Sequence, residues 1–219
     1  MSVFIIAGHR HTTFRLGRHV LHTSFSLAAR AFRRGAAAVF GAVVSAEGTQ
    51  AQSAQPYSAQ LAVLFTTIRV GTTSVAGTGI EPQFRFNRLY ATEGFGALSL
   101  GIGGQYAVHT RGNDRLRIGG VFLEPRWVPA TGSSRLFPYL SARLALLQMN
   151  GRFQFAEGGN SGGSGLGIGA GLAVKLSRTA NFDAGAQLVR QEFGTIGTVT
   201  FLPFTSYAAK AGISLGFPK

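Results

Sequence analysis

The stretch YAAKAGISLGF, residues 207–217, alternates apolar residues with small or polar ones without a break. Strict alternation predicts a β-strand, because successive side chains of a strand point to opposite faces of the sheet. One face of this strand is apolar, whereas the other carries mainly glycine, serine and lysine. The pattern suits a closed sheet whose apolar side faces lipid and whose small, polar side faces inward.

The composition limits the ways in which this chain can cross a membrane. Its 219 residues suffice for one domain and, at most, a targeting segment. Charged residues make up only 13%, and the absence of cysteine excludes a disulfide framework and a thiolate metal site. No window of about 18 consecutive apolar residues occurs. A bilayer-spanning form of this chain must therefore be a closed barrel, which satisfies its backbone groups by strand pairing.

The formal net charge of +13 is unevenly distributed. Six of the 21 basic residues lie in the first 34 positions. Without them and Glu47, 15 basic and 7 acidic residues remain, a net charge of +8, and they are spread singly along the chain. This distribution favours a basic rim facing anionic lipid over a nucleic-acid interface.

Residues 30–51 have the features of a secretory signal in the expected order. A basic start is followed by a short apolar run and by a small-x-small cleavage site that ends at Ala51. We expect cleavage after Ala51, with a second candidate site at residues 44–46. Residues 1–51 are therefore interpreted as a leader and signal peptide, and residues 52–219 as one β-barrel domain.

Eight stretches of the presumed mature chain follow the period-two pattern, with turn residues between them and no helical period. They cover residues 57–67, 79–89, 95–109, 115–128, 137–149, 165–176, 181–193 and 207–217. The sequence thus predicts an all-β fold, an eight-stranded antiparallel up-and-down transmembrane β-barrel. An even number of strands places both ends of the barrel on the same side of the membrane.

The connections between these strands are expected to alternate between long and short, as in outer-membrane barrels. Long connections are predicted near residues 68–78, 150–164 and 194–206, and short or fairly short ones near 91–94, 129–136 and 177–180; the connection near 110–114 is brief. The Gly/Ser-rich residues 158–165 are expected to lie in the longest loop and to be flexible and exposed.

Charged residues occupy positions that the alternation assigns to the barrel interior. They are Glu81, Arg85, Glu124, Arg126, Arg143, Lys175, Asp183 and Lys210, accompanied by Gln83, Gln105 and Gln187. An eight-stranded barrel is just wide enough inside for side chains to fill it or for one small ligand. Buried charges must pair or stay hydrated, so we expect a network that fills and rigidifies the barrel, or else one that lines a narrow path or pocket. Lys175 and Asp183 flank a tight turn and form the first pair that we expect.

Aromatic residues on the outward face are expected to form the interfacial girdles of the barrel and to anchor it in the bilayer. They are Tyr57, Phe84, Phe86, Tyr106, Trp127, Phe182, Tyr207 and Phe217.

Two motifs with catalytic or cofactor potential are better explained as structural. Residues 165–170 match a loose dinucleotide fingerprint, but the glycines continue inside an alternating strand where the motif needs a following helix. His109, near Asp114, is interpreted as a solvated loop residue, because no convincing serine partner is evident. We therefore expect no enzymatic activity, no cofactor and no metal site.

The end of the chain resembles a known assembly signal. Lys210, Gly212, Leu215 and Phe217 match the C-terminal recognition pattern of bacterial outer-membrane barrels, polar-x-Gly-x-x-apolar-x-apolar. Residues 52–219 as a whole resemble the small eight-stranded outer-membrane barrels of the OmpA, OmpX and OmpW type. The resemblance implies a monomer in the outer membrane of a Gram-negative-type bacterium, with both barrel termini periplasmic. Its implied partners are outer-membrane lipid, lipopolysaccharide and the barrel-assembly machinery, without nucleic acid.

Three functions remain open at this point. The first is a non-enzymatic structural or surface-interaction barrel with a largely side-chain-filled polar lumen. The second is a narrow channel or transporter for small solutes, hydrophobic ones among them. The third is a soluble barrel of lipocalin type, which predicts the opposite orientation, with the apolar face lining the interior.

Overall fold

The computed structural model describes residues 55–70, 73–92, 94–131, 133, 135–153, 156–196, 199–200 and 202–217. The predicted leader and signal peptide, residues 1–51, and the candidate cleavage sites lie outside these residues. No helix in the described ranges is long and apolar enough to cross a membrane.

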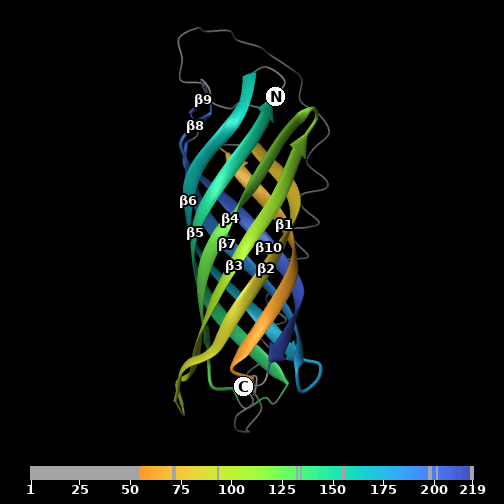
Figure 1. Cartoon of the computed structure of the whole chain (residues 1–219), viewed down its shortest axis with the longest axis vertical. Coiled ribbons are helices and arrows are strands. Elements are labelled where there is room, and N and C mark those ends of the chain that lie inside the picture. The colour runs from red at the N-terminus through yellow and green to blue at the C-terminus, as the bar shows by residue number, and fades with distance from the viewer. Residues whose placement is uncertain are drawn as a thin grey trace.

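Eight long antiparallel strands close into one barrel in the order β1-β10-β7-β6-β5-β4-β3-β2 (Figure 1). Their bounds are β1 Tyr57–Val70, β2 Thr73–Thr92, β3 Gly96–Arg111, β4 Asp114–Val128, β5 Leu136–Phe153, β6 Ala156–Lys175, β7 Ala180–Phe193 and β10 Phe204–Phe217. A small hairpin of β8 (Thr195–Ile196) and β9 (Val199–Thr200) lies between β7 and β10 in the chain. The predicted eight-stranded up-and-down barrel is confirmed.

Pairing between β1 and β10 closes the barrel. Tyr57 lies opposite Phe217 at one end of this seam, and Arg69 lies opposite Thr205 near the other. We call the end at Tyr57 and Phe217 the lower end and the opposite end the upper end, as they stand in Figure 1. The start of β1 and the end of β10 therefore share one end of the barrel, as an even number of strands requires.

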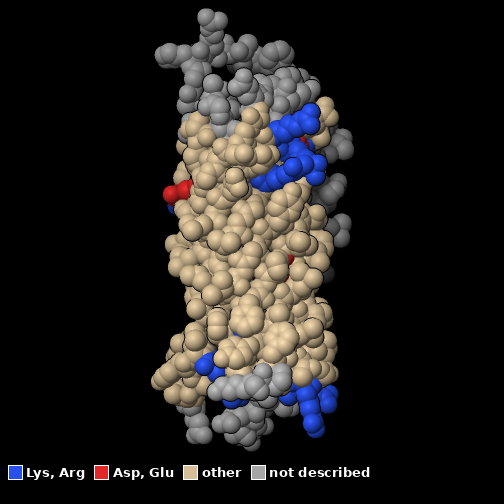
Figure 2. Space-filling view, viewed as in Figure 1, with Lys and Arg blue, Asp and Glu red and all other residues tan. Residues whose placement is uncertain are grey.

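The apolar face of the sheet points outward. Leu166, Ile168 and Leu215 are 63%, 67% and 50% exposed, whereas Arg143 is 3% exposed. Figure 2 shows Lys and Arg side chains near the two ends of the visible face and a middle wall that is almost free of charge. This is the orientation of a membrane barrel, and the lipocalin-type alternative, with an apolar face lining the interior, is wrong.

Several strands are longer than the sequence predicts. Residues 68–70 and 73–78 belong to strands and not to the predicted long loop, since β1 and β2 stay paired up to Val70 and Thr73. Residues 158–165 belong to β6 and pair with β5, so the predicted flexible loop there is wrong. The backbone ladder continues where the apolar alternation has ended, because strand pairing uses N–H and C=O groups and not side chains. The brief connection near 110–114 is confirmed, with β3 ending at Arg111 and β4 beginning at Asp114.

Glycine at position 212 allows the seam strands to approach each other. It lies opposite Ala62 of β1, and a Cβ atom on Gly212 would overlap the Leu61 carbonyl oxygen and lie 2.6 Å from the Ala62 Cα atom. These are backbone atoms of a paired strand, which cannot move without disturbing the ladder. By contrast, a Cβ atom on Gly162 of β6 would meet nothing within 4 Å.

We expect Gly212→Ala to destabilise the folded barrel by about 1–3 kcal/mol, the usual cost of overpacking. Gly162→Ala is the matched control and should change stability by less than about 0.5 kcal/mol. The measurement is the free energy of unfolding from urea titrations of protein folded in detergent micelles. Equal stabilities of the two variants would show that the seam does not need glycine at position 212.

Candidate functional site

The structure brings seven of the eight predicted interior charges together inside the barrel. Each of these side chains is buried, and they come from β2, β4, β5, β7 and β10: Glu81, Arg85, Glu124, Arg126, Arg143, Asp183 and Lys210. The eighth, Lys175, lies at the last position of β6 at the lower end and is only half-buried. We call the seven buried residues the lumen cluster.

Glu124 is the centre of the lumen cluster and is completely buried. Its carboxylate accepts hydrogen bonds from four cationic side chains and one amide: Arg85 at 2.8 Å, Arg126 at 3.3 Å, Arg143 at 2.5 Å, Lys210 at 3.1 Å and Gln187 at 2.7 Å. These donors reach it from β2, β4, β5, β7 and β10. One carboxylate therefore ties together strands from opposite sides of the barrel.

The other two carboxylates extend the lumen cluster along the barrel axis. Glu81 accepts from Arg143 at 2.7 Å and from Lys210 at 3.1 Å, so two cations bridge Glu81 and Glu124. Asp183 accepts from Arg126 at 2.6 Å on one oxygen and from the Tyr139 hydroxyl at 2.8 Å on the other.

Two aromatic rings pack against the arginines of the lumen cluster. The guanidinium of Arg126 lies 3.7 Å from the ring centroid of Tyr139, and that of Arg143 lies 3.8 Å from that of Phe122. Such stacking is favourable because the ring face attracts a desolvated cation. Tyr139 is not among the network residues that the sequence predicts, although its odd position on β5, shared with Ser141 and Arg143, lies on the inward face.

The expected pair of Lys175 and Asp183 is not among the ion pairs of the described residues. In the β6–β7 hairpin Lys175 lies opposite Asn181, whereas Asp183 lies opposite Ala173, one step further into the barrel. Asp183 is buried there and bonds Arg126 from β4 instead. Sequence proximity across a turn suggested the pair, but the nearest cation to Asp183 comes from the other side of the barrel.

The upper part of the lumen contains a large apolar cluster beside buried polar side chains such as Thr66, His109 and Gln191. Above the lumen cluster the interior is filled by buried hydrophobic side chains, which we call the apolar plug: Ile68, Ile118, Phe122, Ala145, Leu147, Met149, Phe193 and Phe204. Phe122 belongs to the plug and also stacks on Arg143, so the two layers are in direct contact. The expectation of a polar lumen therefore fits the lower and middle parts better than the upper part, where inward positions such as Ile68, Ile118 and Met149 are apolar.

The prediction that His109 is a solvated loop residue is wrong. His109 lies on β3, is 2% exposed, and its Nε2 atom is hydrogen-bonded to the Thr66 hydroxyl at 2.7 Å. The strand continues past the point where apolar alternation ends, so position 109 keeps its inward direction. Within the described ranges, no group of three or more His, Cys, Asp or Glu side chains could hold a metal ion.

The four residues of the proposed assembly signal occupy three different environments on β10. Leu215 and Phe217 are exposed on the outer face, Gly212 lies at the seam, and Lys210 is buried in the lumen cluster. Lys210 thus has a structural role inside the barrel that does not depend on recognition by another protein.

We expect Glu124→Gln to destabilise the folded protein by about 3–5 kcal/mol, since it leaves four buried cations without their shared partner. Glu192→Gln is the control, because Glu192 forms an exposed ion pair with Arg190 on the outer face, and we expect a loss below about 0.5 kcal/mol. Urea unfolding in micelles measures both values. A loss below 1 kcal/mol for Glu124→Gln would mean that water hydrates the cations of the lumen cluster.

Comparisons with known proteins agree with this architecture. No family model matches the sequence, and no curated protein matches it either. Among solved structures, the chain is similar to Neisserial surface protein A, with 18% identity, a TM-score of 0.59, and coverage of 74% of this chain and 97% of that one. Weaker similarity extends to Ail of Yersinia pestis, with 15% identity and a TM-score of 0.43, covering 74% of this chain and 97% of Ail. The N-terminal β-barrel domain of Pseudomonas aeruginosa OprF has 18% identity and a TM-score of 0.42, with coverage of 77% of this chain and 100% of the domain.

The first of these similarities carries the comparison, because its TM-score lies above 0.5. It spans nearly the whole of the other chain, and both strand number and closure correspond to what the topology shows. The chain therefore has the fold of the small eight-stranded outer-membrane β-barrels.

Proposed function

We propose that this protein is an integral outer-membrane barrel with a structural or surface-interaction role, no enzymatic activity and a sealed lumen. The observation that carries the proposal is the filling of the interior by two successive layers, the lumen cluster and the apolar plug. Salt-bridged side chains of opposite strands cross the barrel in one layer, and packed hydrophobic side chains exclude water from the other.

The outer wall supports insertion into a bilayer. Near the lower end, the rings of Tyr57, Phe84 and Phe86 lie 5.3–6.1 Å apart, and Phe95 packs on Trp127 at 5.6 Å. The Trp127 indole N–H donates to the Phe95 carbonyl at 2.9 Å. Aromatic rings gathered at one end of an apolar wall, with the amphipathic rings of Tyr57 and Trp127 among them, are typical of a membrane–water interface. We propose that the lower end, with both barrel termini, faces the periplasm.

A sealed lumen predicts a protein that does not conduct ions across a bilayer. Reconstituted into planar lipid bilayers, the wild-type barrel should produce no steady single-channel conductance, because the packed side chains of the apolar plug are expected to block a water path. Correct folding of the same preparation is checked by the heat-modifiable gel mobility of membrane barrels.

The channel alternative gives the opposite result in the same experiment. Stepwise conductance of the wild type that is abolished by Gly169→Leu would overturn the sealed-lumen proposal. Gly169 suits this purpose because a Cβ atom there would lie 2.8–2.9 Å from Gln187, the Ala186 carbonyl oxygen and Ser141, so a larger side chain would crowd the lumen. Folding of this variant is checked by the same gel mobility. Loss of conductance in Gly169→Leu, with Gly162→Leu unaffected, would identify the lumen as the path.

We further propose that the upper end binds the phosphates of lipopolysaccharide. Arg115 of β4 lies directly opposite Arg152 of β5, and Arg117 lies two residues further along the same face. All three are exposed and share the outward parity of Val121 and Leu123. Clustered arginines at the edge of an apolar wall attract anionic headgroups.

The last strand, with Leu215 and Phe217 outward, is proposed to bind the barrel-assembly machinery.

Lipopolysaccharide should raise the thermal unfolding midpoint of the micelle-folded protein, and the triple variant Arg115→Ser, Arg117→Ser, Arg152→Ser should lose most of this increase. The control is the double variant Arg88→Ser, Arg178→Ser, which removes exposed charges elsewhere on the protein and should keep the full increase. The same response in both variants would show that the three upper arginines do not form the binding site.

A further inference from the structure

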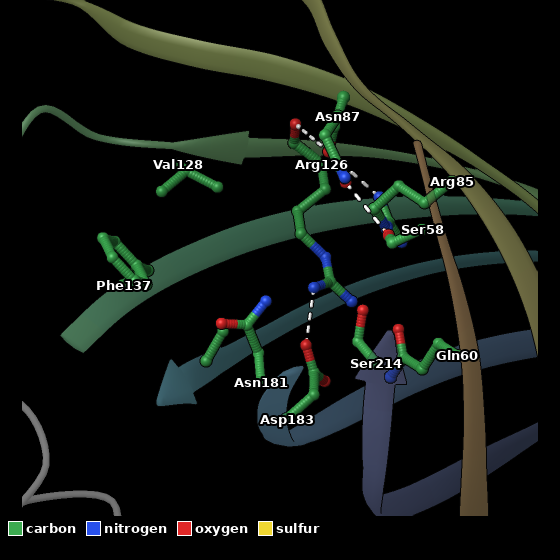
Figure 3. Close-up of a pocket in the computed structure, with 12 residues that line it drawn as sticks. Ser58, Gln60, Arg85, Asn87, Arg126, Val128, Phe137, Asn181, Asp183 and Ser214 are labelled. Atoms are coloured by element: carbon green, nitrogen blue, oxygen red, sulfur yellow. Dashed lines mark hydrogen bonds and ion pairs between the residues drawn. The ribbon is translucent and has the colours of Figure 1, made fainter. Parts of the chain in front are cut away.

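A small, partly enclosed space lies between the lumen cluster and the lower mouth of the barrel. Its volume is about 70 Å³, and its walls include Ser58, Gln60, Arg85, Arg126, Asp183 and Ser214. Figure 3 shows these side chains converging from several strands, with Arg126 crossing the space toward Asp183. We call this space the lower cavity. One water molecule requires roughly 10–15 Å³ of such space, so the lower cavity has room for a larger occupant.

Three residues that line the lower cavity carry hydrogen-bond donors without partners. The Gln60 amide nitrogen and the Nε atoms of Arg85 and Arg126 are buried and have no hydrogen-bond partner in the structure. Each of these three residues is at most 6% exposed. Since an arginine guanidinium has donors and no acceptor, these groups require an occupant that accepts hydrogen bonds.

The local charge is positive. The lumen cluster contains four cations and three carboxylates among the described residues. Asp183, the carboxylate that lines the lower cavity, already accepts from Arg126 on one oxygen and from Tyr139 on the other. Lys175 adds a further cation at the same end of the barrel, on the inward-facing parity of β6. The excess positive charge favours an anion over a neutral hydrogen-bond acceptor such as water.

We propose that the lower cavity binds a monovalent halide-sized anion, chloride in the cell, through the Gln60 amide and the Nε–H groups of Arg85 and Arg126. The anion accepts hydrogen bonds from these orphan donors and balances the fourth cation of the lumen cluster. A single ion can serve both purposes, because Gln60, Arg85 and Arg126 line the same space and two of them belong to the positively charged lumen cluster. A buried cation without a counterion is costly, so occupancy should stabilise the folded barrel.

The direct test is a bromide soak of crystals of the full-length mature protein grown in gluconate. Bromide scatters anomalously, and we expect one anomalous peak within hydrogen-bond distance of Gln60, Arg85 and Arg126. Weak density without an anomalous signal would mean that water alone fills the lower cavity, and the proposal would fail.

A solution measurement tests the same site independently. The thermal unfolding midpoint in micelles should rise when chloride replaces gluconate at constant ionic strength, and half of the rise should occur at a defined chloride concentration. Gln60→Glu places a carboxylate in the lower cavity and should abolish the chloride response while raising the midpoint in gluconate.

The matched control is Gln148→Glu, on the outer face of β5, which should respond to chloride as the wild type does. A wild type that is insensitive to chloride would overturn the proposal. A chloride response that persists unchanged in Gln60→Glu would also overturn it, because chloride would then act elsewhere on the protein.

Discussion

The closure of the sheet between β1 and β10 is the constraint on which the rest of this structure depends. Hydrocarbon offers no hydrogen-bond partner, so each backbone N–H and C=O group within it must be paired inside the protein. An open sheet leaves two unpaired edges, whereas the ladder from Tyr57 and Phe217 to Arg69 and Thr205 leaves none along the seam. The residues at the seam follow from this requirement, with small Ala62 and Gly212 facing each other where the strands meet.

Closure also decides where the charges go. Once the apolar face is turned outward, each charged residue on the opposite face shares a narrow interior with the others. Glu124 and Lys210 are 86 residues apart in sequence but in contact across the barrel. The cost of removing these charges from water is offset because each carboxylate of the lumen cluster accepts from at least two donors. The ionic layer is therefore a consequence of orientation and closure together.

The apolar plug shows that the two faces of a barrel strand need not differ in polarity along its whole length. Ile68 and Ile118 face inward near the upper end, where their strands also carry exposed residues such as Arg69 and Arg117 on the outer face. There the polarity of the faces is reversed, since water lies outside and packed side chains lie inside. Together with the lumen cluster, this reversal supports the proposal of a rigid barrel with a sealed lumen.

The sequence by itself determined the number of strands, the outward direction of the apolar face and the set of inward charges, because alternation is a local property of each strand. Only the tertiary structure decided that Asp183 bonds Arg126 rather than Lys175, that Tyr139 joins the network, that His109 is buried and that residues 158–165 extend β6. These features depend on register and on closure, which bring together strands distant in the chain. Backbone pairing, moreover, continues without any apolar signal in the side chains, so strand ends cannot be read from hydrophobicity alone.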